Sequence, residues 1–332
     1  FIQSLAVRRF AIRDQDEDYC GFVDGAVYVE ALFGAGAWHK RIRSHMEAFQ
    51  PDVVLVAAED PGQTVLQIAI ECGCRNLVVL VQTSWTLPFG PFSACPNQRN
   101  AGLFKSASRI LTISNYLQGY LQQHAGIEST VVRLPVFGKE PFSQFPPFSN
   151  GRIVMINPSA VKGISIFSSL MELNPSLPFG AVATWATSAS DLQRLNAYPN
   201  FRELQPNEDI DDILRQTRVM LVPSLWDEGF GYIATESLLR GVPTMASDAG
   251  GLPEAMVESN FVLPVRGIRE YASAYSERGY PEPIVPKQDI TEWNRVLREM
   301  TSTEALYRQV AKDGRAKALA FVRKIDIYPV IR

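Results

Sequence analysis

The 332-residue sequence has few cysteines, and their spacing excludes two common uses of the thiol. Cys72 and Cys74 are separated by a single residue, which is too close for ordinary disulfide geometry or for a usual pair of zinc ligands. Cys20 and Cys95 complete the set of four. Free thiols are typical of a reducing compartment, so we expect a cytoplasmic protein.

Histidine is also scarce. The three histidines, His39, His45 and His124, show no spacing that is typical of metal ligands. We therefore expect no metal site built from this chain, and no cofactor.

The sequence lacks an excess of either charge. Its 32 basic and 35 acidic residues give a net charge of −3, which argues against a nucleic-acid partner held by bulk charge but leaves room for a local basic pocket. No run approaches the roughly 18 apolar residues of a membrane span, so we expect no transmembrane segment, while peripheral membrane contact and the oligomeric state stay open. Phe1 is not an initiator methionine, so the natural start of the protein is left open.

Short apolar runs alternate with helical patterns along most of the chain. This pitch predicts a parallel α/β sheet with helices on both faces in each half of the molecule. The length and the 46% hydrophobic content suffice for two domains. The runs that we interpret as strands are residues 51–56, 76–81, 109–113 and 130–134 in the first half, and 152–156, 180–183, 219–222 and 243–246 in the second.

A segment rich in proline, glycine and serine, residues 137–151, reads as a linker between the halves. Two open sheets joined there would leave a cleft between the carboxyl ends of their strands, where ligands of such folds bind. Residues 34–38 offer a glycine-containing turn with no clear strand directly before it. We therefore expect the first strand and glycine loop of the first half to be missing.

The most informative feature is a pair of acids, Glu228 and Glu236, separated by seven residues. A buried strand pattern over residues 217–223 precedes them, so Glu228 falls on a loop at the carboxyl end of a strand. Glu236 falls inside the following helix, roughly two turns on. Two acids placed in this way can hold two hydroxyl-bearing ends of one long ligand, such as a nucleotide-sugar. The alternative is that both are solvated charges on a helix face.

The loop after Glu228 contains Gly229, Phe230 and Gly231. Its glycines let phosphates approach the backbone at a helix start, where free N–H groups attract anions. Lys162 and Gly163 also follow a strand and open a helix, so the lysine can reach a diphosphate; the alternative is a surface lysine.

These segments resemble the family 4 glycosyltransferases, which are retaining enzymes of the GT-B fold. The segment from Glu228 to Glu236 resembles that family's acid-x7-acid motif, residues 156–163 its phosphate-binding Lys-Gly segment, and residues 241–254 the stretch that closes its donor site. The resemblance implies two Rossmann-like doubly wound parallel-sheet domains facing a central cleft. It implies an acceptor-side domain over 1–140, a nucleotide-sugar-binding domain over 141–305, and a terminal helix over 306–332 that crosses back to the first domain.

The resemblance also implies roles for single residues. Glu228 would accept hydrogen bonds from the donor sugar and Glu236 from the ribose, while Lys162 and backbone N–H groups would meet the diphosphate of a UDP- or GDP-sugar without a protein-bound metal. Many relatives carry an arginine where this chain has Asn157, and Arg133 or Lys139 are candidates to replace it. The remaining donor-binding candidates are Gly163, Trp185, Pro223, Gly229, Phe230, Gly231, Gly250 and Gly251.

Several of these candidates have structural alternatives. Trp185 has a core position as its alternative, and Gly250 and Gly251 a purely structural turn. On the acceptor side, Trp85 and Phe89 lie in a proline-stiffened aromatic loop that suits stacking on a sugar or a flat aglycone, but a hydrophobic plug fits equally. Trp38 and His39 are further acceptor-side candidates.

The pattern therefore predicts a retaining glycosyltransferase that moves a sugar from a nucleotide diphosphate to an acceptor hydroxyl. The acceptor could be a polysaccharide, a glycolipid or a secondary metabolite. The alternatives are a sugar-nucleotide epimerase or phosphorylase on the same scaffold, or a non-catalytic nucleotide-sugar-binding protein. No carboxylate pair is placed as in a glycosidase.

Overall fold

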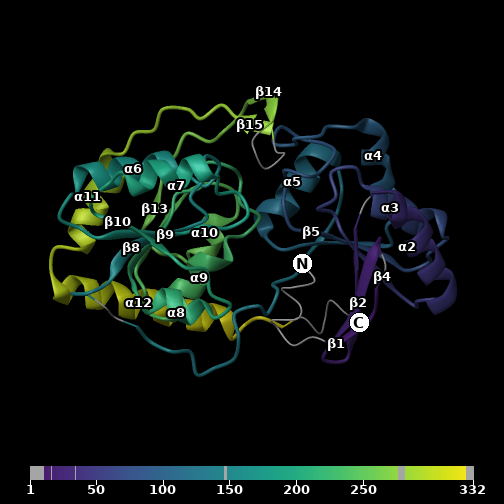
Figure 1. Cartoon of the computed structure of the whole chain (residues 1–332), viewed down its shortest axis with the longest axis horizontal. Helices are drawn as coiled ribbons and strands as arrows, with labels where there is room; N and C mark the ends of the chain where they lie inside the picture. Colours follow the sequence, from purple (N-terminus) through teal and green to yellow (C-terminus); the bar gives the residue numbers. More distant parts are fainter. Residues whose placement is uncertain (1–10, 16, 34, 146–147, 276–280, 327–332) are drawn as a thin grey trace.

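The computed structural model describes residues 11–326 with the exception of 16, 34, 146–147 and 276–280. Two parallel sheets dominate the described chain, and each is covered by helices (Figure 1). The predicted fold class, α/β with two parallel-sheet units, is confirmed. All eight predicted strands are present, with small shifts at their ends.

The first sheet has four parallel strands in sequential order, which are β4 (Val54–Ala57), β5 (Leu77–Val81), β6 (Arg109–Thr112) and β7 (Thr130–Val131). Its helices are α2 (Ala35–Phe49), α3 (Thr64–Glu71), α4 (Gln98–Leu103) and α5 (Asn115–Ala125), with a short 3-10 turn at Phe104–Ser106. Sequential order follows from the short β-α-β connections, which place each new strand beside the last.

The second sheet has six parallel strands in the order β10-β9-β8-β11-β12-β13. The strands are β8 (Arg152–Ile156), β9 (Phe179–Val182), β10 (Phe201–Leu204), β11 (Thr217–Val222), β12 (Thr244–Ser247) and β13 (Val262–Leu263). The chain winds outward from β8 in one direction and from β11 in the other. The point where the direction reverses, between β8 and β11, is where open α/β sheets bind ligands at the carboxyl ends of their strands.

The helices of the second half are α6 (Ile164–Leu173), α7 (Ala189–Asn196), α8 (Ile210–Leu214), α9 (Tyr232–Leu239), α10 (Leu252–Ala255), α11 (Thr291–Met300) and α12 (Glu304–Val322). Every residue of β9, β11 and β12 is buried, which explains their unbroken apolar pattern. One core cluster contains Val79 from the first sheet together with Val154 and Val222 from the second, so the two halves pack on each other.

The N-terminal part corrects one expectation. β3 (Val27–Leu32) ends shortly before residues 35–38, which open α2, so the prediction that no strand precedes this part of the sequence is wrong. β3 belongs to a three-stranded antiparallel sheet with β1 (Ala11–Gln15) and β2 (Tyr19–Asp24), apart from the parallel sheet. β3 is exposed to half-buried and carries Glu30, so it lacks the continuous apolar run that marks a buried parallel strand.

The C-terminal helix α12 lies along the second half. Gly314 lies against Leu238 of α9, the guanidinium of Arg315 donates to the carbonyl of Phe142, and Arg323 pairs with Glu140 of the linker at 2.7 Å. Residues 327–332 lie outside the described chain. The predicted crossing to the first domain and the three domain limits stay predictions.

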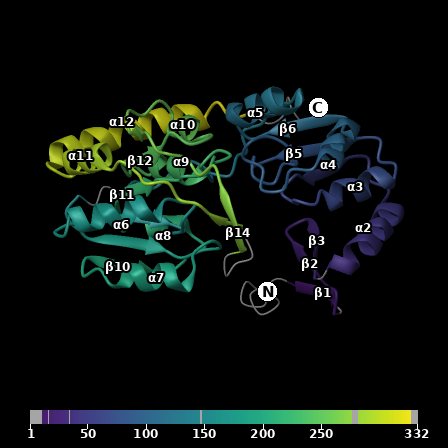
Figure 2. The same ribbon diagram turned by 90° about the horizontal axis from the view of Figure 1, so that it is seen from above.

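A short antiparallel hairpin, β14 (Tyr271–Tyr275) with β15 (Pro281–Pro283), comes between β13 and α11. Both ribbon views place it at the junction between the two halves (Figures 1 and 2). Among the described residues, no helix combines the length and the apolar character needed to cross a bilayer.

Candidate functional site

Two loops at the switch point of the second sheet carry the opposing charges of the site. The loop after β8 begins at Asn157, which has a left-handed φ of 62°, and ends at Gly163, which caps α6 with a φ of 84°. A Cβ atom on Gly163 would overlap the backbone of Pro223 at the end of β11. Gly163 is therefore needed both for its conformation and for the close approach of the two loops.

The loop after β11 brings Glu228 against Lys162. The lysine Nζ lies 2.5 Å from Glu228 Oε1, and the Ser224 hydroxyl donates to the same oxygen at 2.6 Å. The two charged side chains are only 17% and 12% exposed. Burial opposes ionisation of Glu228, but the Lys162 ammonium and the two hydrogen bonds outweigh it and hold the pKa of Glu228 below its ordinary value. The structure therefore pairs these two largely buried side chains with each other, where the sequence predicted two ligand-binding residues.

A cavity of about 320 Å³ opens beside this pair, and we call it the central cavity. From the second half it is lined by the predicted residues Lys162, Trp185, Pro223, Glu228, Gly229, Phe230 and Gly231. From the first half it is lined by Glu59, Gln82 and Ile113. The start of α9, at Tyr232 and Ile233, also opens on it, so the positive end of that helix faces the space beside Lys162.

The glycines around Glu228 act mainly through packing. A Cβ on Gly229 would overlap the carbonyl oxygen of Gln82 in the first half, and one on Gly251 would overlap the backbone of Gly229. The N–H of Gly251 donates to the carbonyl of Glu228 at 2.7 Å. Gly250 and Gly251 do not line the central cavity; they hold the Glu228 loop from behind. These contacts are those of the alternative interpretation of Gly250 and Gly251, a purely structural turn.

Phe230 and Glu236 lie differently from their motif neighbours. The Phe230 side chain is 2% exposed and packs against the rings of Tyr232 and Phe321, so only its backbone is available to a ligand. Glu236 is the fifth residue of α9, little more than one turn from the helix start rather than two. Burial raises its pKa, the Arg240 charge opposes this, and no hydrogen bond or ion pair joins Glu236 to another described residue.

Neither proposed substitute for the missing arginine reaches the central cavity. Arg133 pairs with Glu254 at 2.5 Å and donates to the carbonyl of Ile113 at 2.7 Å. Lys139 is exposed in the linker. Asn157 itself lines the cavity: its Oδ1 accepts from Ala186 N–H at 3.0 Å, whereas its buried Nδ2 has no partner among the described residues and is free to donate to a ligand.

The acceptor-side candidates separate into three groups. Trp85 lines a second cavity, described below. Phe89 packs edge-on against Phe104, with ring centroids 5.6 Å apart, and so joins the hydrophobic plug that was its alternative. Trp38 and His39 lie on α2 and line neither cavity; α2 packs on α3.

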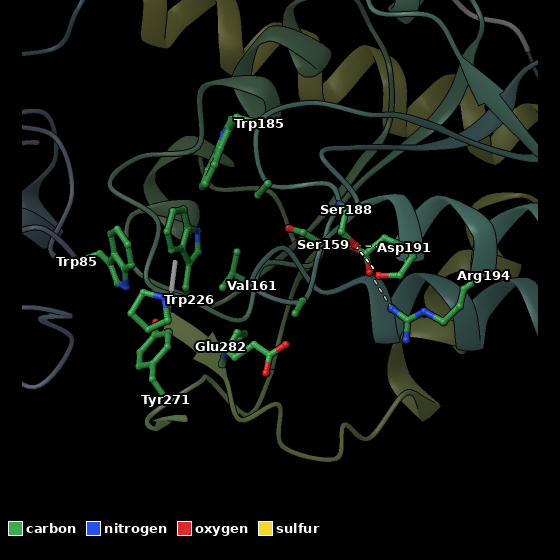
Figure 3. A pocket seen from close by; sticks show the side chains of 15 residues that line it. Trp85, Ser159, Val161, Trp185, Ser188, Asp191, Arg194, Trp226, Tyr271 and Glu282 are labelled. Atoms are coloured by element: carbon green, nitrogen blue, oxygen red, sulfur yellow. Dashed lines mark hydrogen bonds and ion pairs between the residues drawn. The ribbon is translucent and has the colours of Figure 1, made fainter. Parts of the chain in front are cut away.

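The second cavity has a volume of about 460 Å³ and is rich in aromatic side chains; we call it the aromatic cavity (Figure 3). Trp85 from the first half meets Trp185, Trp226 and Tyr271 from the second. Trp185 lines both cavities. Trp226 and Tyr271 were missed in the sequence: Trp226 stands two residues before Glu228, and that spacing was a usable signal, whereas nothing local marks Tyr271.

Among the residues that the structure describes, no group of three or more His, Cys, Asp or Glu side chains could hold a metal ion. The four cysteines are free thiols.

Comparison with known proteins finds similarity to glycosyltransferases. Residues 195–277 match the family model described as glycosyl transferases group 1. An uncharacterised glycosyltransferase, YqgM of Bacillus subtilis, is 27% identical over 173 residues, which cover 48% of each chain. A D-inositol 3-phosphate glycosyltransferase of Corynebacterium efficiens is 32% identical over 93 residues, 28% of this chain and 22% of that protein. The chain thus aligns with about half, or less, of the length of these curated relatives.

Two solved structures share the fold. A sucrose-phosphate synthase from Thermosynechococcus elongatus matches with a TM-score of 0.68 at 14% identity, over 95% of this chain and 83% of that one. Anabaena HepE in complex with UDP and glucose matches with a TM-score of 0.62 at 17% identity, over 90% and 81%. These likenesses show the GT-B fold. The match of residues 195–277 to the family model and the similarity to YqgM confirm the resemblance at the level of the group 1 glycosyltransferases. Family 4 is compatible with that result.

Proposed function

We propose that this chain, a glycosyltransferase of the group 1 type with a GT-B fold, is a retaining enzyme that transfers a sugar from a nucleoside diphosphate to an acceptor hydroxyl. The observation that carries the proposal is the Lys162–Glu228 pair, which lies at the switch point of the second sheet and faces the first domain across the central cavity. That position lets one ligand touch both domains.

The charges of the central cavity suit a diphosphate at one end and a sugar at the other. Lys162 supplies a positive charge and the start of α9 supplies N–H groups, which together meet the negative charge that develops on the departing nucleoside diphosphate. Glu228 is ionised and accepts hydrogen bonds from sugar hydroxyls. Asn157 Nδ2, buried and without a partner among the described residues, adds a neutral donor where many relatives carry an arginine.

Trp185 and Glu236 are assigned to different parts of the nucleotide. Trp185 is 48% exposed and lines the cavity, so its ring is available to a base or sugar face. Glu236, behind the start of α9, is assigned to the ribose, which requires that nucleotide binding bring a hydroxyl to its carboxylate. Anabaena HepE, a structural neighbour, was solved with UDP-glucose. This supports a UDP-sugar as the first donor to test here.

Retention of configuration comes from the resemblance to family 4, whereas independence of metal is proposed because the histidines and cysteines of the sequence show no ligand spacing, and no cofactor is proposed. Acceptor class, peripheral membrane contact and a cytoplasmic location likewise stay proposals. A nucleic-acid partner is not proposed, because the net charge of −3 gives no bulk attraction.

One assay separates the enzyme from its alternatives. The chain is incubated with a panel of UDP- and GDP-sugars, and release of the nucleoside diphosphate is followed with and without acceptor extract. A transferase releases the nucleotide faster with acceptor; an epimerase isomerises the donor without release; a phosphorylase requires phosphate; a binding protein shows no turnover. Lys162→Ala abolishes release, whereas Lys312→Ala, at an exposed lysine of α12, retains it.

A further inference from the structure

The aromatic cavity is separate from the central cavity but adjoins it. It forms where Trp85 of the first domain, the loops after β8 and β11, the start of α7 and the β14–β15 hairpin meet. Figure 3 shows Trp85, Trp226 and Tyr271 gathered on one side, with Ser159, Ser188 and Asp191 on the other and the Glu282 carboxylate between them. None of the donor roles assigned above uses Tyr271 or Glu282.

The rings of this cavity are inclined to one another and do not stack flat. The centroids of Trp85 and Trp226 are 6.2 Å apart at 54°, and those of Trp185 and Trp226 are 5.8 Å apart at 37°. Inclined rings at these separations form walls with faces available to a ligand, whereas parallel contact would bury the faces against each other. The apolar C–H face of a pyranose ring packs well on such a wall.

The polar groups of the cavity suit hydroxyls better than phosphates. Asp191 and Arg194 neutralise each other at 2.8 Å, and Asp191 is also committed to the capping box of α7. Glu282 then leaves the lining with a charge of −1, which repels an anion. Its carboxylate has no hydrogen-bond or ion-pair partner among the described residues.

A buried donor is also left unused. Ser159 is 3% exposed and lines the cavity, and its hydroxyl has no partner in the described part of the chain. A buried hydroxyl without a partner costs free energy, which a ligand hydroxyl would recover. Aromatic walls, together with a carboxylate and a buried hydroxyl that have no partner within the described ranges, fit an uncharged polyol ring.

We propose that the aromatic cavity binds a neutral saccharide ring of the glycosyl acceptor, held between Trp85 and the β14–β15 hairpin. The proposal rests on the proposed function, and it deepens it by naming the acceptor as a glycan or glycoside. Trp226 connects the two sites, because its ring lies 4.6 Å from Lys162 Nζ on one side and lines the aromatic cavity on the other. An acceptor bound there lies next to the donor's reacting end.

Both domains and the hairpin are required to form the aromatic cavity. Trp85 comes from the first domain and Tyr271 with Glu282 from the hairpin, so the cavity exists only when the domains are packed as they are here. Burial raises the pKa of the Tyr271 hydroxyl, which therefore stays neutral and can donate to a sugar oxygen at neutral pH.

The test measures saccharide binding to the full chain in the absence of donor. Methyl α-D-glucopyranoside, maltose, cellobiose and N-acetylglucosamine serve as neutral probes, and saturation-transfer NMR with tryptophan fluorescence reports their binding. Tyr271→Ala and Glu282→Gln are compared with Glu270→Gln, which removes an exposed carboxylate of the same segment outside the cavity lining. UDP affinity is measured on every variant.

At least one probe is expected to bind, with Kd raised about 5- to 10-fold in Tyr271→Ala and Glu282→Gln and unchanged in Glu270→Gln. UDP affinity stays the same in all three. Binding of none of the probes to the wild-type chain, or a loss of UDP affinity in Tyr271→Ala, overturns the proposal, the latter because the cavity would then belong to the donor.

The result of the saccharide-binding test does not depend on the result of the nucleotide-sugar turnover assay. If the probes bind as expected while no nucleotide-sugar is turned over, the saccharide site stands and the transferase assignment fails. If a nucleotide-sugar is turned over while no probe binds, the transferase stands and the acceptor site fails.

Discussion

Replacing Glu228 by glutamine gives the sharpest test of how the donor is oriented. Glutamine keeps the size of the side chain and an oxygen that can accept from Ser224, but it removes the charge that faces Lys162 at 2.5 Å. Breaking a fully buried ion pair costs about 3–5 kcal/mol, and the partial exposure of this pair reduces our expectation to about 2 kcal/mol of unfolding free energy.

The effect on turnover is expected to exceed the effect on nucleotide affinity. A contact to sugar hydroxyls that strengthens as the leaving group departs is worth roughly 2–3 kcal/mol, so Glu228→Gln lowers kcat on the order of 100-fold. UDP affinity stays within about 5-fold of wild type and shifts toward tighter binding. The reason is that Lys162 no longer has to break its ion pair with Glu228 before it contacts the diphosphate. Lys162→Met, the matched variant, weakens UDP instead.

Steady-state kinetics gives kcat and KM for the donor, and calorimetry gives the affinity for UDP. If Glu228→Gln weakens UDP by 10-fold or more and leaves kcat intact, the two acids of the motif are assigned in reverse. The donor would then lie the other way round in the central cavity.

The pH dependence of stability provides an internal check on the same pair. The folded pKa of Glu228 lies below its unfolded value of about 4.3, so the pair stabilises the fold above that pH and loses this contribution as the pH falls through the folded pKa. The stability difference between wild type and Glu228→Gln should therefore be constant from about pH 6 to pH 8 and vanish only on strong acidification.

Three further changes probe other parts of the site. Burial raises the folded pKa of Glu236, so its ionised form costs stability once the pH rises through that pKa. Glu236→Gln should therefore raise Tm by about 2 °C at pH 7.5, while it weakens UDP binding roughly 10- to 100-fold. Unchanged UDP affinity would remove the ribose role. Gly229→Ala should shift the Gln82 carbonyl and lower activity at least 10-fold with the fold retained, whereas Gly102→Ala, where no atom lies within 4 Å, should be neutral in both circular dichroism and assay. Activity should persist in excess chelator, and loss that magnesium or manganese restores would contradict a metal-independent transfer.

The parallel sheets could be predicted because their strands are buried on both faces. Residues 153–155 and 219–222 are continuous apolar runs, and the structure buries them in the middle of the second sheet. β10 (Phe201–Leu204) was missed because it is an edge strand with Arg202 exposed and little apolar pattern. The N-terminal antiparallel sheet was missed because β1 is largely exposed and β3 is nowhere fully buried, with Glu30 interrupting its apolar run.

The central cavity could be predicted because its residues belong to two loops that begin where apolar strands end. Lys162 and Glu228 are 66 residues apart, but parallel strands next to each other bring their carboxyl ends together. The sequence did not predict that these two charges pair with each other. That pairing depends on the register between β8 and β11 and on Gly163 packing against Pro223.

The aromatic cavity could not be predicted, because its parts come from five separate segments with no common pattern. Trp85, Ser159, Trp226 and Tyr271 are separated by dozens of residues, and only the contact between the domains and the position of the hairpin bring them together. Trp226 is the residue that joins this cavity to the predicted site. Its place two residues before Glu228 puts one ring beside Lys162 and between Trp85 and Trp185. If the two cavities bind donor and acceptor as proposed, a change at Trp226 alters the binding of both, whereas changes at Tyr271 or Glu282 alter acceptor binding alone. This asymmetry follows from the geometry and makes the hairpin the right place to separate the two substrates by mutation.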